Sequence, residues 1–259
     1  MDYGLMHVLL IGPRGDDGDA RSARTVLAGL ARAAVAAGER VSWLGTADDG
    51  GLPADDRIER ITTGSRAPRF RRVEAWLTDA PRERALCKTL REAPCDLVHV
   101  HGFGGAYSYL LPWLADRLGV PVVVLAAPIE PVLCHRKTMI DARGERCMVW
   151  DDALRCARCC RTRSADGLGG AASMAAALCR PLRGLSPFPH RTAFLNRLDM
   201  LAQGLGVART VVVADAAARD AILALGVQER SIRCGVPSDA GDWLELWRQA
   251  LPSRPPAPA

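Results

Sequence analysis

The sequence lacks any apolar run long enough to cross a membrane. Its longest apolar stretches, such as 120–127, have the length of a β-strand, whereas a membrane-spanning helix needs about 20 apolar residues. The first residues also lack the basic segment of a secretory signal peptide, and an apolar strand pattern follows almost at once. We therefore expect no transmembrane segment and a cytoplasmic protein, with a peripheral position at the inner membrane as the other location to consider.

Lysine is almost missing from this basic chain. It occurs only at Lys88 and Lys137, although the formal net charge is +5. The positive charge comes from arginines that are spread over the whole sequence, whereas nucleic-acid-binding proteins gather basic side chains on one face. We therefore expect no nucleic-acid partner. The dinucleotide-binding pattern G-x-G-x-x-G is also absent, so we expect no NAD.

What is present is an alternation of strand and helix patterns. Apolar runs of strand length occur at 6–11, 40–44, 57–62, 96–101, 120–125 and 210–214. Helical spacing of apolar residues occurs between them, at 20–37, 71–77, 81–92, 107–118, 170–179, 191–203 and 216–225. Such alternation predicts an α/β fold, a single Rossmann-like domain with a parallel sheet flanked by helices. The four most apolar runs, near 6–12, 96–101, 120–125 and 210–214, should lie inside the sheet rather than at its edges.

Glycines follow the first predicted strand, at Gly12, Gly15 and Gly18. Ligands of open α/β sheets bind outside the carboxyl ends of the strands, and these glycines would let a ligand approach the backbone amides there. His101 and Gly102 end another predicted strand and should emerge at the same edge. We therefore predict a binding site at these five residues; the alternative is that the glycines only form a tight turn. His99, two residues before His101, fits a core histidine better.

Five of the nine cysteines fall between residues 134 and 160. A C-x-x-C pair lets two thiolates approach one metal ion, and two further thiolates complete a tetrahedron. The preferred ligands are Cys134, Cys147, Cys156 and Cys159. Structural zinc is the default metal, although an iron–sulfur cluster also takes four thiolates. Cys160 is not needed as a ligand or could replace one of the four, and His135 is a fallback ligand. The alternative to a metal site is a set of free thiols or a redox pair.

The segment of about 130–165 that carries these cysteines shows no clear periodicity. We therefore predict a long cysteine-rich loop insertion, which is unusual for an ordinary connection. Structural zinc contributes on the order of 10 kcal/mol to folding, enough to order such a loop.

Several separated segments resemble the N-terminal, acceptor-side domain of family-4 glycosyltransferases, which have two Rossmann-like domains in the GT-B arrangement. One is the first strand, its glycine loop and a helix ending in Ala37-Gly38-Glu39-Arg40-Val41. The most specific is Asp96-Leu97-Val98-His99-Val100-His101-Gly102, followed by Leu118-Gly119-Val120-Pro121-Val122-Val123-Val124. A third runs from Arg209 to Pro237. Some members of the family also have cysteines spread through the loop after the same strand.

The resemblance implies that residues 1–237 form the glycosyltransferase-like domain, and that 238–259 add a short helix and a disordered proline-rich tail. Two departures stand out. Family members often carry a histidine after the strand that here ends in Leu125, but this chain has Ala126-Ala127-Pro128. Alanine cannot transfer a proton through its side chain, so we assign no catalytic residue. The family's C-terminal donor domain, which binds the nucleotide sugar, is also expected to be absent.

Two functions follow as hypotheses. The first is the acceptor-binding half of a split or truncated glycosyltransferase, which would act on a glycan or a lipid-linked acceptor. A separate donor-domain chain would then supply the nucleotide-sugar site, because this chain alone is not expected to bind the donor. The second is a non-catalytic binding or scaffold protein derived from the same fold and stabilised by a structural metal.

Overall fold

The computed structural model describes residues 5–13, 18–46, 55–64, 77–103, 108–134, 138–141, 143–147, 149–166 and 191–252. They form one parallel seven-stranded sheet in the order β3-β2-β1-β4-β5-β6-β7. The strands are β1 (His7–Ile11), β2 (Arg40–Thr46), β3 (Ile58–Thr63), β4 (Leu97–Val100), β5 (Val122–Leu125), β6 (Thr210–Val213) and β7 (Ile232–Cys234). The predicted Rossmann-like α/β fold is therefore confirmed, and the four most apolar runs form the interior strands β1, β4, β5 and β6.

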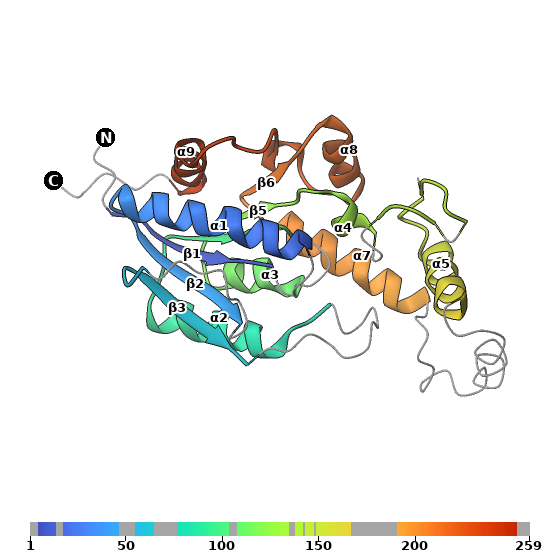
Figure 1. The fold of residues 1–259 in the computed structure, drawn as a ribbon, viewed down its shortest axis with the longest axis horizontal. Coiled ribbons are helices and arrows are strands. Elements are labelled where there is room, and N and C mark those ends of the chain that lie inside the picture. Colours follow the sequence, from blue (N-terminus) through green and yellow to red (C-terminus); the bar gives the residue numbers. More distant parts are fainter. Residues whose placement is uncertain are drawn as a thin grey trace.

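Helices connect the strands and cover the sheet (Figure 1). They are α1 (Gly18–Ala36), α2 (Ala80–Glu92), α3 (Leu110–Arg117), α4 (Glu130–Leu133), α5 (Ala153–Asp166), α7 (Arg191–Gly206), α8 (Ala216–Ala224) and α9 (Ala240–Ala250). Aspartates cap three of them: the side chains of Asp79, Asp215 and Asp239 accept hydrogen bonds from backbone amides in the first turns of α2, α8 and α9. Such caps satisfy amides that have no partner within the helix.

The sheet separates two apolar cores because successive strand residues point to opposite faces. Leu9 and Ile11 of β1 belong to one core, which also contains side chains of α2, α3 and α7. Val8 and Leu10 belong to the other, which is built from α1 and α9 and includes the fully buried Trp247. Helix α9 thus packs on the same sheet face as α1.

Two features were not foreseen as the structure has them. Strand β7 was not predicted at all. The cysteine-bearing segment is not simply a long loop, since it contains α4 and the four-turn helix α5. Helix α5 escaped the periodicity because the side chains it buries, Ala153, Cys156 and Ala157, are small and weakly apolar. The helix predicted at 170–179, all but the last residue of the helix predicted at 71–77, and most of the proline-rich tail lie outside the described residues.

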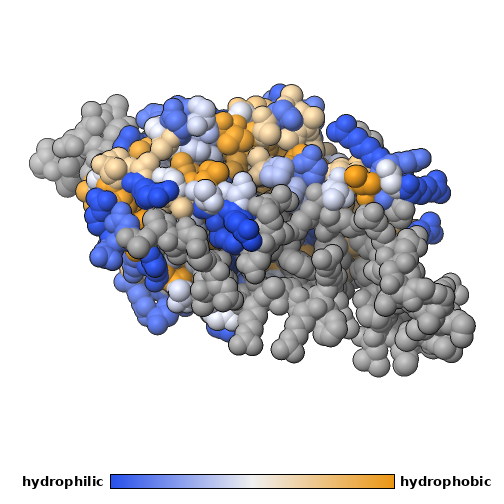
Figure 2. Space-filling view, viewed as in Figure 1, coloured by the Kyte–Doolittle hydropathy of each residue, from blue (hydrophilic) through white to orange (hydrophobic). Residues whose placement is uncertain are grey.

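The visible surface is mixed in character. Apolar side chains gather between α9 and α8 in the orientation of Figure 1, with hydrophilic side chains beside them (Figure 2). Val236, in the connection from β7 to α9, is 42% exposed. Among the described helices, none is both long enough and apolar enough to cross a membrane.

Candidate functional site

The predicted binding residues meet at the carboxyl ends of two neighbouring strands. Gly12 directly follows β1, and His101 and Gly102 directly follow β4. The backbone amide of His101 donates to the carbonyl of Ile11 over 3.0 Å, which ties the two strand ends together. Gly18 is the first residue of α1, whereas Gly15 lies outside the described residues.

Close packing explains why glycine occupies these positions. A Cβ atom on Gly12 would lie 3.1 Å from a methyl group of Leu27 and 3.2 Å from the ring of Trp43, so α1 and β2 leave almost no space there. Gly102 has a φ of +72°, a conformation that is unfavourable for residues with a Cβ. Both glycines therefore have a structural reason, and this holds whether or not a ligand binds.

His99 and His101 form a buried pair at this edge. His99 Nε2 and His101 Nδ1 lie 3.1 Å apart, and the side chains are 0% and 3% exposed. The ring of Trp243, from α9, packs edge-on against His99 with centroids 4.9 Å apart and also contacts His101. His99 is thus a core histidine, as expected, and His101 lies beneath α9 rather than open to solvent.

Burial keeps both rings neutral. It lowers the pKa of His101 to about 4, and burial followed by the neighbouring His101 lowers the pKa of His99 well below its usual value. Among the described residues, His99 Nδ1 has no hydrogen-bond partner. We infer that His99 donates through Nε2, because a buried lone pair without a donor is less costly than a buried N–H without an acceptor. His101 then accepts at Nδ1 and carries its proton on Nε2.

Two buried arginines at this edge were missed in the sequence. Arg24 of α1 donates to the carbonyl of Pro13 over 3.5 Å, and Arg82 of α2 donates to the carbonyl of Gly12 over 3.4 Å. Both side chains are buried. Nothing in the sequence distinguishes them from the many other helical arginines, because only the fold brings α1 and α2 to the end of β1.

The end of β5 lacks a polar side chain. Ala126 is fully buried, and its backbone amide donates to the carbonyl of Val212 over 2.8 Å. The position where family-4 glycosyltransferases often have a histidine therefore offers no group for proton transfer.

The cysteines expected to bind a metal lie on three neighbouring segments. Cys134 is the C-cap of α4, Cys147 follows a turn, and Cys156 and Cys159 lie on α5. Burial raises the pKa of the Cys156 thiol to about 12, the Arg197 guanidinium lowers it, and the other three thiols raise it further. Within the described part of the chain, no group of three or more histidine, cysteine or carboxylate side chains is arranged so that it could hold a metal ion as it stands.

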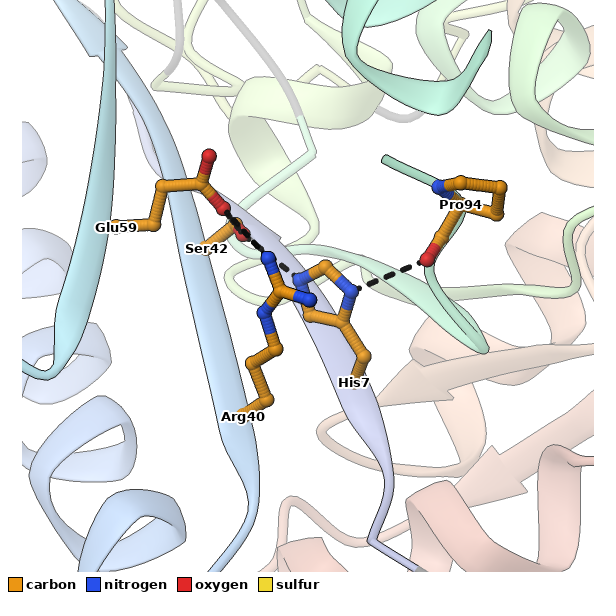
Figure 3. A network of polar contacts seen from close by, with 5 residues as sticks. All are labelled: His7, Arg40, Ser42, Glu59 and Pro94. Atoms are coloured by element: carbon orange, nitrogen blue, oxygen red, sulfur yellow. Dashed lines mark hydrogen bonds and ion pairs between the residues drawn. The ribbon is translucent and has the colours of Figure 1, made fainter. Parts of the chain in front are cut away.

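A second polar cluster lies at the opposite, amino edge of the sheet (Figure 3). His7 Nε2 and Ser42 Oγ are 2.8 Å apart, Ser42 donates to Glu59 over 2.6 Å, and His7 Nδ1 lies 3.2 Å from the carbonyl of Pro94. Arg40 pairs with Glu59 over 3.6 Å. Burial lowers the pKa of His7, and the Pro94 carbonyl opposes that shift. This cluster joins β1, β2 and β3 at the edge where ligands of such sheets do not bind.

One family model matches part of this chain. Residues 23–126 match the family model of Glycosyltransferase Family 4. This stretch runs from α1 through β5 and includes His101 and Gly102. No curated protein sequence matches the chain.

Three solved structures align with most of this chain at low sequence identity. A sucrose-phosphate synthase structure from Thermosynechococcus elongatus aligns with a TM-score of 0.47 and 14% identity, over 94% of this chain and 98% of that one. The UDP-N-acetylglucosamine 2-epimerase of Rickettsia bellii gives 0.45 and 12%, over 95% of this chain and 47% of that one. A Glycyrrhiza uralensis UGT complexed with glycyrrhetinic acid 3-O-monoglucuronide gives 0.41 and 13%, over 92% of this chain and 51% of that one. The chain therefore spans about half the length of the last two.

The expected resemblance is confirmed over the segment that the family model covers. This chain is a glycosyltransferase-like protein with a Rossmann-like fold, in which residues 23–126 match Glycosyltransferase Family 4.

Proposed function

We propose that this chain is the acceptor-binding half of a glycosyltransferase that transfers a hexosyl group from a nucleotide sugar. The match of residues 23–126 to Glycosyltransferase Family 4 carries the proposal. The acceptor binds at the edge formed by Gly12, His101 and Gly102, and Gly15 and Gly18 belong to the same proposed site. The unpartnered Nδ1 of the buried His99, directly behind His101, supports a functional edge, since such an atom calls for an explanation.

The acceptor in this proposal is a glycan or a lipid-linked molecule. It would bind beside Arg24 and Arg82, which donate to the carbonyls that follow β1.

In this proposal, a separate donor-domain chain binds the nucleotide sugar. The described residues form one sheet with its flanking helices, and a cleft between two domains needs a second wall. That wall would supply the cationic and amide groups that bind the diphosphate.

The second candidate is a non-catalytic binding or scaffold protein of the same fold. The buried methyl group of Ala126 at the end of β5 favours it, because this position cannot act as a general acid or base. The two candidates differ in one respect that can be measured, namely whether any partner restores sugar transfer.

The test is to purify the chain from its native source, identify the proteins that accompany it, and assay sugar transfer with and without them. We expect no transfer from any nucleotide sugar by the chain alone, and transfer to a lipid-linked phosphate acceptor when a donor-domain chain is added. His101→Ala should abolish this transfer, whereas His7→Gln, at the opposite edge of the sheet, should retain it. Transfer by the chain alone that His101→Ala abolishes would contradict the split arrangement. If the chain binds an acceptor but no sugar transfer occurs with any of the accompanying proteins, the result would favour the non-catalytic binding or scaffold protein.

A further inference from the structure

The sheet itself brings the rings of His99 and His101 together. Successive residues of a strand point to opposite faces, so these two side chains, two positions apart, lie on the same face, which α9 covers. The backbone at this strand end is fixed on both sides. The amide of His101 donates to the carbonyl of Ile11 over 3.0 Å, and the amide of Phe103 donates to that of Leu125 over 2.7 Å. The strands on either side, β1 and β5, therefore hold the pair in place.

One hydrogen bond joins the two rings. His99 Nε2 and His101 Nδ1 lie 3.1 Å apart, and both rings are neutral because burial lowers both pKa values. A neutral imidazole has one N–H and one lone pair, so one ring donates and the other accepts. The bond therefore couples the two tautomers. Either both histidines carry their proton on Nε2, or both carry it on Nδ1.

The packing of α9 favours the first of these two arrangements. The ring of Trp247 contacts His99 with centroids 5.5 Å apart, and neither Trp247 Nε1 nor His99 Nδ1 has a hydrogen-bond partner among the described residues. The indole N–H can only donate. A proton on His99 Nδ1 would leave two buried donors without an acceptor in this packing, whereas a lone pair there leaves one donor and one acceptor on rings in contact. Buried N–H groups without an acceptor are the rarer case.

We propose that His99 is a positioning residue that holds the proton of His101 on Nε2, so that His101 acts at the carboxyl edge as a hydrogen-bond donor and not as a base. This inference rests on the proposed function, in which the sugar acceptor binds at this edge. The group of the acceptor that faces His101 is then an oxygen with a free lone pair, such as a hydroxyl or phosphate oxygen. His99 does not touch the acceptor and acts only through His101.

The first test measures the tautomers and needs no acceptor. The chain has five histidines, and in the full chain labelled with 15N at these residues, protonated and bare ring nitrogens differ strongly in NMR chemical shift. Single substitutions of histidine by glutamine assign the signals. At neutral pH we expect an N–H at Nε2 and a bare Nδ1 in both His99 and His101. A proton on Nδ1 of His101 would overturn the proposal, whatever the variants show.

The second test removes the hydrogen bond from His99. His99→Phe keeps a ring against Trp243 but has no N–H, so His101 should shift to a mixture of its two tautomers. His99→Gln retains an amide N–H and should keep the proton of His101 on Nε2. His7→Gln, at the opposite edge of the sheet, is the matched control and should leave the His101 signals unchanged. If His101 keeps its wild-type tautomer in folded His99→Phe, or loses it in folded His99→Gln, His99 does not position it.

A third measurement separates this inference from the proposed function. In the transfer assay with the accompanying donor-domain chain, His99→Phe should lower the rate about 2- to 10-fold, as expected for the loss of one hydrogen bond, and His99→Gln should lose less. If no combination restores transfer but the tautomers are as expected, the proposed function is wrong and the positioning by His99 stands. If transfer is restored and His99→Phe is as fast as wild type although its His101 tautomer has changed, His101 does not act as a hydrogen-bond donor to the acceptor.

Discussion

Two histidine clusters lie at opposite edges of the same sheet, and they differ in how their polar atoms are satisfied. At the amino edge, each ring nitrogen of His7 has a partner, in Ser42 and the Pro94 carbonyl. At the carboxyl edge, His99 has one polar partner, His101, and its Nδ1 has none among the described residues. Buried polar groups are normally paired, so the amino-edge cluster follows the usual rule and the carboxyl-edge pair departs from it at one atom.

The two clusters also differ in which segments of the chain surround them. The amino-edge cluster joins three neighbouring strands through side chains of those strands and the Pro94 carbonyl (Figure 3). The carboxyl-edge pair is covered by Trp243 and Trp247 of α9, a helix that is distant in sequence. The amino-edge cluster is therefore largely built into the sheet, whereas the carboxyl-edge pair depends on the docking of α9.

The largest loss of stability should come from removing the tryptophan packing of α9 over the histidine pair. Trp247→Ala should lower the free energy of unfolding by about 3–5 kcal/mol, because a fully buried tryptophan leaves a large cavity. Trp247→Phe retains an aromatic ring and removes an indole N–H that has no partner in the described residues, so it should cost distinctly less. Urea denaturation at neutral pH measures both. Equal losses in the two variants would mean that α9 does not depend on this packing.

Acid should destabilise the protein through the carboxyl-edge pair. The folded-state pKa of His101 is about 4, below its unfolded value of about 6.5. The unfolded chain therefore binds the proton first, and stability is lost as the pH falls from about 6.5 towards 4. From this residue alone the loss reaches about 3 kcal/mol.

Urea denaturation at pH 7 and pH 4.5 can separate this contribution from that of other groups. His101→Gln should flatten the pH dependence relative to wild type, and the difference between the two proteins removes the shared contribution of the carboxylates. An unchanged pH dependence in His101→Gln would contradict the burial of a neutral ring at this position.

A smaller effect is expected at the amino edge. Ser42→Ala removes the hydroxyl between His7 and Glu59 and leaves His7 Nε2 without that partner, which should cost about 1–3 kcal/mol. Thermal denaturation measures the loss, and acceptor binding should not change, because the substitution lies at the other edge of the sheet. If Ser42→Ala weakened acceptor binding and left the stability unchanged, the two edges of the sheet could no longer be distinguished.

The sequence predicted the sheet well and the site only in part. Apolar runs such as 120–125 have one favourable position in an α/β domain, the interior of a parallel sheet, so pattern alone was sufficient. Strand β7 has only three residues and includes the exposed Arg233 and Cys234, so it gave no apolar signal. The predicted edge residues Gly12, His101 and Gly102 are brought together, but the pattern could not reveal that α9 covers His101.

The sequence by itself determined the strands, their parallel arrangement and the ends at which Gly12 and His101 lie, because these follow from local periodicity and from the geometry of βαβ units. Only the tertiary structure decided which distant side chains surround those positions. Arg24 and Arg82 donate to carbonyls at the end of β1, Trp243 covers the histidine pair, and Arg197 of α7 donates to the carbonyl of Leu133 in α4. The physical reason is that burial and electrostatic environment depend on contacts between residues far apart in the chain, which no local pattern records.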